Sequence, residues 1–140
     1  MDLLTYRYKI GRFIIFSTIL LFILILALTI TGGFIPSECT ELFSYLIPIK
    51  AMYLTAVVKF VLAQRHQPNR AQAEASPFYR LTTRIFIYSH ITLLYLLILL
   101  CAFNVIDFKF LLYGIGILES FCGIYIGLIV TDLFPATKKG

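Results

Sequence analysis

Four long apolar stretches fill most of this 140-residue chain, and they constrain its fold more than any motif does. They cover about residues 13–31, 42–63, 85–105 and 110–130. An α-helix rises about 1.5 Å per residue, so about 20 apolar residues cross the roughly 30 Å hydrocarbon core of a bilayer. Each stretch reaches that length, and the remaining segments are too short for a separate soluble core. We therefore predict one all-α, polytopic membrane domain over residues 1–140, with four transmembrane helices.

The basic residues predict how these helices are oriented. Charged residues make up 14% of the chain, below the quarter typical of soluble domains, yet the net charge is +5. Lys and Arg cluster before the first span, between the second and third, and after the fourth, whereas the other two connections hold only Lys109. Short loops rich in Lys and Arg stay cytoplasmic. The sequence thus predicts two helical hairpins, with both termini and the loop 64–84 on the cytoplasmic side of a membrane such as the bacterial inner membrane.

Four ionisable residues lie inside the predicted spans: Lys50, Lys59, His90 and Glu119. A charged group in the hydrocarbon core costs at least a few kcal/mol unless it is paired or hydrated, so each is a candidate for function. The second and fourth spans run in the same direction, and Lys50 and Glu119 lie at similar depths along them. This predicts a buried ion pair, within one chain or between subunits. Such a pair can fix the helix register or form part of a transport pathway, and both interpretations stay open here.

The other mid-span features have simpler explanations. Lys59 lies near the cytoplasmic end of its span, where its long side chain can reach the headgroups. His90 is predicted at a depth close to that of Lys59, as a neutral imidazole bonded to a neighbouring helix or as a proton relay. Pro48 has no N–H to donate to the Ser44 carbonyl, so it predicts a kink beside Lys50.

Small residues follow one face of the fourth span. Their spacing of four, three and four residues brings them together, and small residues let helix backbones approach closely in a membrane. This face predicts a close helix contact within the chain or across a subunit interface, and we expect at least a homodimer. Its members are Gly116, Ser120, Gly123 and Gly127.

The residue types needed for catalysis do not occur in a recognisable pattern. Cys39, Cys101 and Cys122 are isolated, without a C-x-x-C pair or a Cys/His cluster, so we expect no metal, no cofactor and no thiol chemistry. A disulfide between Cys39 and Cys101 is chemically possible near the outer face, but unpaired thiols are expected. We predict a protein that is not an enzyme and, because its positive charge serves orientation, one that does not bind nucleic acid directly.

The layout resembles two known families. Two hairpins with a basic stretch after the second span, Phe-Val-Leu-Ala-Gln-Arg at 60–65, resemble the GtrA family of lipid-linked sugar flippases, although the His-Gln-Pro sequence at 66–68 departs from its aromatic pattern. Four spans without catalytic motifs also resemble the membrane subunit of the Kiwa antiphage defence system, which partners a soluble DNA-binding protein. That resemblance implies a soluble cytoplasmic partner and a defence complex, but no particular site residues.

The sequence therefore predicts three functions, in order. The first is an oligomeric membrane scaffold or sensor that recruits a soluble partner, or anionic lipid headgroups, through its basic inner face. The second is a small ion channel, in which Lys50, His90 and Glu119 line or gate a pore bounded by subunits. The third is a small transporter or flippase that moves its substrate past the level of Lys50 and Glu119. The same basic residues can alternatively serve only to set the topology. The predicted docking residues are Arg65, Arg70, Arg80 and Arg84.

Overall fold

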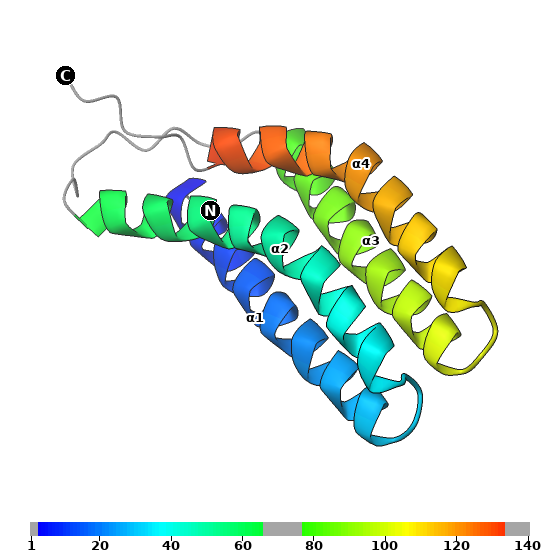
Figure 1. Ribbon diagram of the computed structural model, residues 1–140. Helices are drawn as coiled ribbons and strands as arrows, with labels where there is room; N and C mark the ends of the chain where they lie inside the picture. Colours follow the sequence, from blue (N-terminus) through cyan, green and yellow to red (C-terminus); the bar gives the residue numbers. More distant parts are fainter. Residues whose placement is uncertain (1–2, 66–76, 134–140) are drawn as a thin grey trace.

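The computed structural model describes residues 3–65 and 77–133, and within these ranges the chain is entirely helical. The all-α prediction is confirmed for this part of the chain. Four helices follow one another, α1 (Leu3–Ile30), α2 (Pro36–Arg65), α3 (Pro77–Ala102) and α4 (Phe108–Leu133) (Figure 1). Each helix begins before the apolar stretch that predicted it. An apolar stretch marks only the hydrophobic part of a helix, and the first, more polar turns lie outside it.

The connection between α2 and α3 is shorter than predicted. The sequence pattern assigned residues 64–84 to a loop, but α2 continues to Arg65 and α3 begins at Pro77. Proline is favoured at the first position of a helix, since its fixed φ suits that turn and its missing N–H is not needed there. Arg80 and Arg84 therefore lie on a helix, whereas residues 66–76, including Arg70, lie outside the described ranges.

The helices form a four-sided bundle. α1 packs on α2 and α3, and α4 packs on the same two helices, so the order around the bundle is α1, α2, α4, α3. The α1–α2 and α3–α4 turns lie at the same end (Figure 1). Consequently α2 and α4 are neighbours that run in the same direction, as are α1 and α3.

Both turns are built in the same way. Gly32 and Asn104 adopt left-handed backbone conformations, with φ of 85° and 56°. The N–H of the residue after each donates to the carbonyl five positions back, at 2.7 Å after α1 and 2.8 Å after α3. This is the Schellman arrangement, for which glycine and asparagine are the best suited residues. The two hairpins thus share a turn that ends the first helix and reverses the chain within five residues.

The helices that follow the turns begin with side-chain caps. The Phe110 N–H donates to Asp107 Oδ1 at 2.6 Å, so the Asp107 carboxylate satisfies a free donor of the first turn of α4. In α2 the capping side chain lies inside the helix and reaches back. The Glu38 carboxylate accepts a hydrogen bond from the N–H of Ile35, the residue just before the helix, at 3.1 Å.

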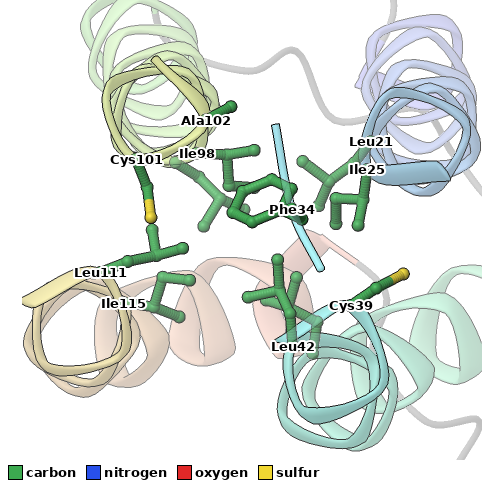
Figure 2. Packing of buried hydrophobic residues seen from close by; sticks show 12 residues of the cluster. Leu21, Ile25, Phe34, Cys39, Leu42, Ile98, Cys101, Ala102, Leu111 and Ile115 are labelled. Atoms are coloured by element: carbon green, nitrogen blue, oxygen red, sulfur yellow. The ribbon is translucent and has the colours of Figure 1, made fainter. Parts of the chain in front are cut away.

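Apolar side chains from all four helices fill the turn end of the bundle (Figure 2). Phe34, from the α1–α2 turn, lies among them and meets the Phe108 ring at a centroid distance of 6.4 Å. We call this cluster the turn-end core. Its buried members are Leu21, Ile25, Phe34, Cys39, Leu42, Leu46, Leu94, Ile98, Cys101, Ala102, Leu111 and Ile115. Cys39 and Cys101 are free thiols, which confirms that they are unpaired.

A smaller core holds the opposite end, and hydroxyl groups contribute to it. The Tyr6 hydroxyl donates to the Arg80 carbonyl at 2.9 Å, joining α1 to α3. Burial raises the pKa of the Tyr6 phenol, although the Arg84 charge opposes that shift, so the hydroxyl keeps its proton as a donor. We call this cluster the tail-end core. Its buried members are Tyr6, Ile10, Ile14, Tyr53, Val57 and Ile87.

Among the described residues, two helices have the length and apolar composition needed to cross a membrane. These segments are Tyr8–Ile30 in α1 and Arg80–Ala102 in α3. Pro48 lies within the continuous helix α2, and Figure 1 shows α2 changing direction part-way along its length, in agreement with the predicted kink.

Candidate functional site

Lys50 and Glu119 form an ion pair inside the bundle. Lys50 Nζ lies 2.6 Å from Glu119 Oε1, and the two residues are only 6% and 7% exposed. Lys50 comes from α2 and Glu119 from α4, the two parallel neighbours. The predicted pair is confirmed, and it forms within one chain.

Helical spacing explains why these charges point inward. The buried positions of α2 include Leu42, Leu46, Lys50, Tyr53 and Val57, at intervals of four, four, three and four residues. Such spacing follows a single face of a helix. Leu111, Ile115 and Glu119 follow the same rule on α4. Lys50 and Glu119 thus continue the buried faces that apolar residues form in the preceding turns of α2 and α4. Because those faces pack into the bundle, the two charged side chains are also held inside it.

His90 joins this pair, which the sequence did not predict. Its Nε2 lies 3.3 Å from Glu119 Oε1, and His90 is 3% exposed. We had placed it near the depth of Lys59, away from the pair. The apolar segment of α3 starts at Arg80 instead of residue 85, so His90 lies near its middle. Because this segment of α3 begins five residues before the predicted start, the imidazole lies at the level of the ion pair and not at that of Lys59.

Tyr53 completes what we call the polar cluster: Lys50, Tyr53, His90 and Glu119. The Tyr53 hydroxyl donates to Glu119 Oε2 at 3.4 Å, a long hydrogen bond. Its ring centroid lies 5.5 Å from Lys50 Nζ, within the range of a cation–π contact. Glu119 therefore interacts with an ammonium, a phenol and an imidazole. With neutral His90 the charges of the cluster cancel.

The imidazole of His90 is close to Glu119 but is not aligned with it as a hydrogen bond. Neither His90 nitrogen has a hydrogen-bond partner among the described residues, although both are buried. Buried polar atoms without partners are uncommon because losing water without replacing its hydrogen bonds is costly. The short Nε2–Oε1 distance becomes an ion pair only when His90 is protonated. His90 is thus the one member of the polar cluster whose bonding capacity is unused within the described structure.

A cavity of about 40 Å³ lies beside the polar cluster, between α1, α2 and α3. A cavity needs roughly 10–15 Å³ in this measure to admit a water, so it has room for a few small molecules of that size. Lys50 and His90 line it, but Glu119 does not. Its other lining residues are Ile14, Ser17, Thr18, Leu21, Tyr53, Ile87, Ile91, Leu94 and Tyr95.

The polar side chains of α1 at the cavity are already bonded. The hydroxyls of Ser17 and Thr18 both donate to the Ile14 carbonyl, at 3.0 and 2.8 Å. The Tyr95 hydroxyl donates to the Ser17 carbonyl at 2.8 Å, which joins α3 to α1. The hydroxyls of Ser17, Thr18 and Tyr95 are therefore all engaged with backbone carbonyls, and the lining of the cavity is largely apolar.

The predicted small-residue face is only partly inside the described structure. Gly116 lies against α2, where a Cβ in its place would come within 2.9 Å of the Tyr45 hydroxyl oxygen. This is a close contact within the chain. Ser120 is exposed. The surroundings of Gly123 and Gly127 lie outside the described part of the chain.

The remaining predicted residues are not brought to the cluster. Arg84 is exposed and Arg80 is half-buried at the start of α3. The side chains of Lys59 and Arg65 are outside the described set, although both residues belong to α2. No group of three His, Cys, Asp or Glu residues within the described ranges is placed to hold a metal ion.

Comparisons with known proteins do not assign the chain to a family. No protein-family model matches it, and neither a curated protein nor a solved structure is significantly similar. The resemblances to the GtrA and Kiwa layouts therefore stay predictions, and the site must be interpreted from its own chemistry.

Neither Tyr53 as a member of the polar cluster nor the cavity is predicted from the sequence. Tyr53 follows Lys50 by three residues, which is one helical turn, so its spacing was a usable signal. Ser17 and Thr18 interrupt an otherwise apolar run and could also have been noted. The cavity itself had no signal, because it depends on how three helices pack.

Proposed function

We propose that this chain is an integral membrane transporter for a small ion or solute, with four spans and both termini in the cytoplasm. The supporting observation is the Lys50–Glu119 ion pair, buried halfway along the bundle beside a cavity and a second titratable group, His90. Charged groups at such a depth mark ion and substrate pathways in membrane proteins.

The outer surface supports the membrane environment. Large apolar side chains are exposed on all four helices, including Phe16, Ile47, Leu93 and Ile117. Only 28% of the apolar window in α1 and 33% of that in α3 is buried. A core helix of a soluble protein buries most of such a segment, and soluble monomers rarely expose large apolar patches. Lipid is the environment in which this surface is stable.

The role of α1 in the fold supports a span that stays in the protein. Tyr6, Ile10 and Ile14 belong to the tail-end core, and Leu21 and Ile25 belong to the turn-end core. A cleaved signal segment would remove side chains from both cores. The exposed Arg12 and Arg84, at the end opposite the turns, support a cytoplasmic tail end by the rule that positive residues stay inside.

The chemistry of the polar cluster suits a carrier. Lys50 and Glu119 neutralise each other, so the interior holds no net charge while the pair is closed. A transported ion or a proton can replace one partner of the pair, which changes the electrostatics of the site without leaving an isolated buried charge. The His90 imidazole lies 3.3 Å from the Glu119 carboxylate, and an imidazole can accept or donate a proton, so His90 can couple the pair to a proton gradient.

Transport can be tested with purified protein in liposomes that contain a pH-sensitive dye. We expect a protein-dependent flux of protons or of the salt ions supplied, and its loss in the Lys50→Met, Glu119→Leu double variant. Arg84→Gln is a matched control, because Arg84 is exposed at the end of the bundle. A double variant that transports as well as the native protein would contradict the proposal.

The exposed basic residues also favour a second candidate, an oligomeric scaffold that binds a soluble cytoplasmic protein or anionic lipid. Arg12 on α1 and Arg84 on α3 are exposed at the proposed cytoplasmic end of two adjacent helices. Affinity purification in mild detergent tests it. Capture of a stoichiometric partner that is lost in Arg12→Gln, Arg84→Gln but kept in the Lys50→Met, Glu119→Leu variant would favour the scaffold over the transporter.

A further inference from the structure

Two cations lie at the same level on the parallel neighbours α1 and α3, near the end of the bundle opposite the turns. The ring of Phe13 on α1 meets that of Tyr88 on α3 edge to face, at a centroid distance of 4.6 Å. Lys9 precedes Phe13 by four residues and Arg84 precedes Tyr88 by four, about one helical turn in each case. Both cations are exposed. We call this group the tail-end seam: Lys9, Phe13, Arg84 and Tyr88.

The positive charge of Arg84 is available to an external anion. Its charge acts on the Tyr6 phenol of α1, which places Arg84 on the side of α3 that adjoins α1. The ion pairs within the described residues both involve Glu119, so Arg84 has none there. The other carboxylates with described side chains lie at the turn end: Glu38, Glu41 and Asp107. A guanidinium that is exposed and has no carboxylate beside it suits a phosphate, which it can bind with two parallel hydrogen bonds.

The surface next to the two cations is apolar and faces outward. Phe16 follows Lys9 by seven residues, so it lies on the same face of α1, and it is 65% exposed. On α3, Tyr88 is 42% exposed. Cations at the end of a span, followed by exposed aromatic rings, match the boundary between headgroups and acyl chains. A soluble protein can reach the cations but not the rings that face the bilayer, so a lipid fits the whole surface better.

We propose that the tail-end seam binds an anionic glycerophospholipid, with the phosphate of its headgroup held by Lys9 and Arg84 and its acyl chains along Phe16 and Tyr88. The inference rests on the membrane placement in the proposed function and not on transport, because neither cation belongs to the polar cluster. The lipid bridges α1 and α3 at the proposed cytoplasmic surface.

Binding of phosphatidylglycerol and of phosphatidylcholine to the purified full-length protein tests this inference. Each lipid is titrated into detergent micelles that contain the protein, and native mass spectrometry measures the lipid bound. Each cation near an anionic headgroup favours binding by about fivefold, so we expect the native protein to prefer phosphatidylglycerol at least roughly tenfold. The double variant Lys9→Gln, Arg84→Gln should bind the two lipids equally.

A second double variant, Arg12→Gln, Lys109→Gln, removes the same net charge outside the tail-end seam. Arg12 lies about 100° around α1 from Phe13, and Lys109 is exposed at the turn end. This control should keep the preference for phosphatidylglycerol. An equal loss of preference in both double variants would show that overall charge attracts the lipid, and an unchanged preference in Lys9→Gln, Arg84→Gln would show that the two cations do not bind it. Either result overturns the inference.

Two measurements on the native protein do not depend on how the variants fold. Glycerophosphoglycerol, the same headgroup without acyl chains, should not displace phosphatidylglycerol at equal concentration, and displacement would assign the site to a soluble phosphate ester instead.

In liposomes, phosphatidylglycerol with a photoreactive headgroup should label α1 and α3 near the tail-end seam. Equal labelling of all four helices would remove only the lipid site, whereas a protein that does not insert into liposomes would contradict the membrane placement as well. Neither outcome depends on flux, so the transport function is tested separately.

Discussion

The turn end and the middle of the bundle are packed by the same four helices but with different chemistry. At the turn end, Phe34 and its neighbours form an apolar core, and the two chain reversals lie against each other. At the middle, the same inward-facing positions of α2, α3 and α4 hold Lys50, His90 and Glu119. The turn end therefore sets the register of the helices, and the polar cluster in the middle of the bundle depends on this register.

The two hairpins are more alike in their turns than in their sequences. Gly32 and Asn104 take equivalent left-handed positions, and α2 and α4 lie in parallel. Parallel neighbours bring residues at similar distances from the turns close to one another. Lys50 and Glu119 lie 14 and 11 residues after the first residues of α2 and α4, a difference of less than one helical turn, so their side chains can meet. The precision of the turn end is therefore a condition for the ion pair.

The largest expected effect comes from removing one charge of the pair. Glu119→Ala leaves Lys50 buried without a partner, so we expect a loss of about 3–5 kcal/mol in the free energy of unfolding. Lys50→Met with Glu119→Leu removes both charges and should restore most of that stability. Denaturant unfolding in detergent measures both. If the single and double variants were equally unstable, the pair would not be the source of the cost.

A substitution in the apolar core should lower the free energy of unfolding by less than the loss of one charge. Leu42→Ala creates a cavity in the turn-end core, where Leu42 is fully buried, and we expect a loss of about 2 kcal/mol. That value is at the low end of the range because, in the proposed membrane environment, lipid is as apolar as leucine, so the variant loses packing contacts and not the free energy of transfer from water. Ile47→Ala, on the exposed face of the same helix, should cost much less. Similar losses at both positions would show that the outer face of α2 is packed as well.

The contact between the turns should respond to a single methyl group. A Cβ on Gly33 would lie 3.1 Å from the Ala102 Cβ, so Gly33→Ala must push the first turn away from α3. We expect a loss of about 1–2 kcal/mol, typical of overpacking. Adding Ala102→Gly should recover part of it, and a double-mutant cycle on melting temperature measures the coupling. Additive effects would mean that the two turns are not in contact.

The smallest expected effect is the loss of a cap. Asp107→Ala removes the acceptor for the Phe110 N–H and should cost about 1 kcal/mol, whereas Asp107→Asn should cost only a few tenths. Unfolding in detergent provides the comparison. A cap change that also reduced the proposed transport activity would show that the register of α4, and not only its stability, is set at the turn.

Local patterns predicted much of the architecture and one contact of the site. Apolar length predicted the helices, and the shared depth of Lys50 and Glu119 predicted their pairing. Asn104 and Asp107 lie in the turn between α3 and α4, and both residue types have strong local preferences for turns. The depth of His90 was wrong because the start of α3 was placed too late, and helix ends depend on caps that a hydropathy pattern does not report.

By itself the sequence determined that this chain is helical and apolar and that it carries a few charges at matching depths, because length, periodicity and charge are properties of each segment. Only the tertiary structure decided that one carboxylate, Glu119, is shared by Lys50, Tyr53 and His90, and that Lys50 and His90 lie beside a cavity whose lining does not include Glu119. Those relations depend on the rotation and register of helices distant in sequence, which the packing of the whole bundle sets.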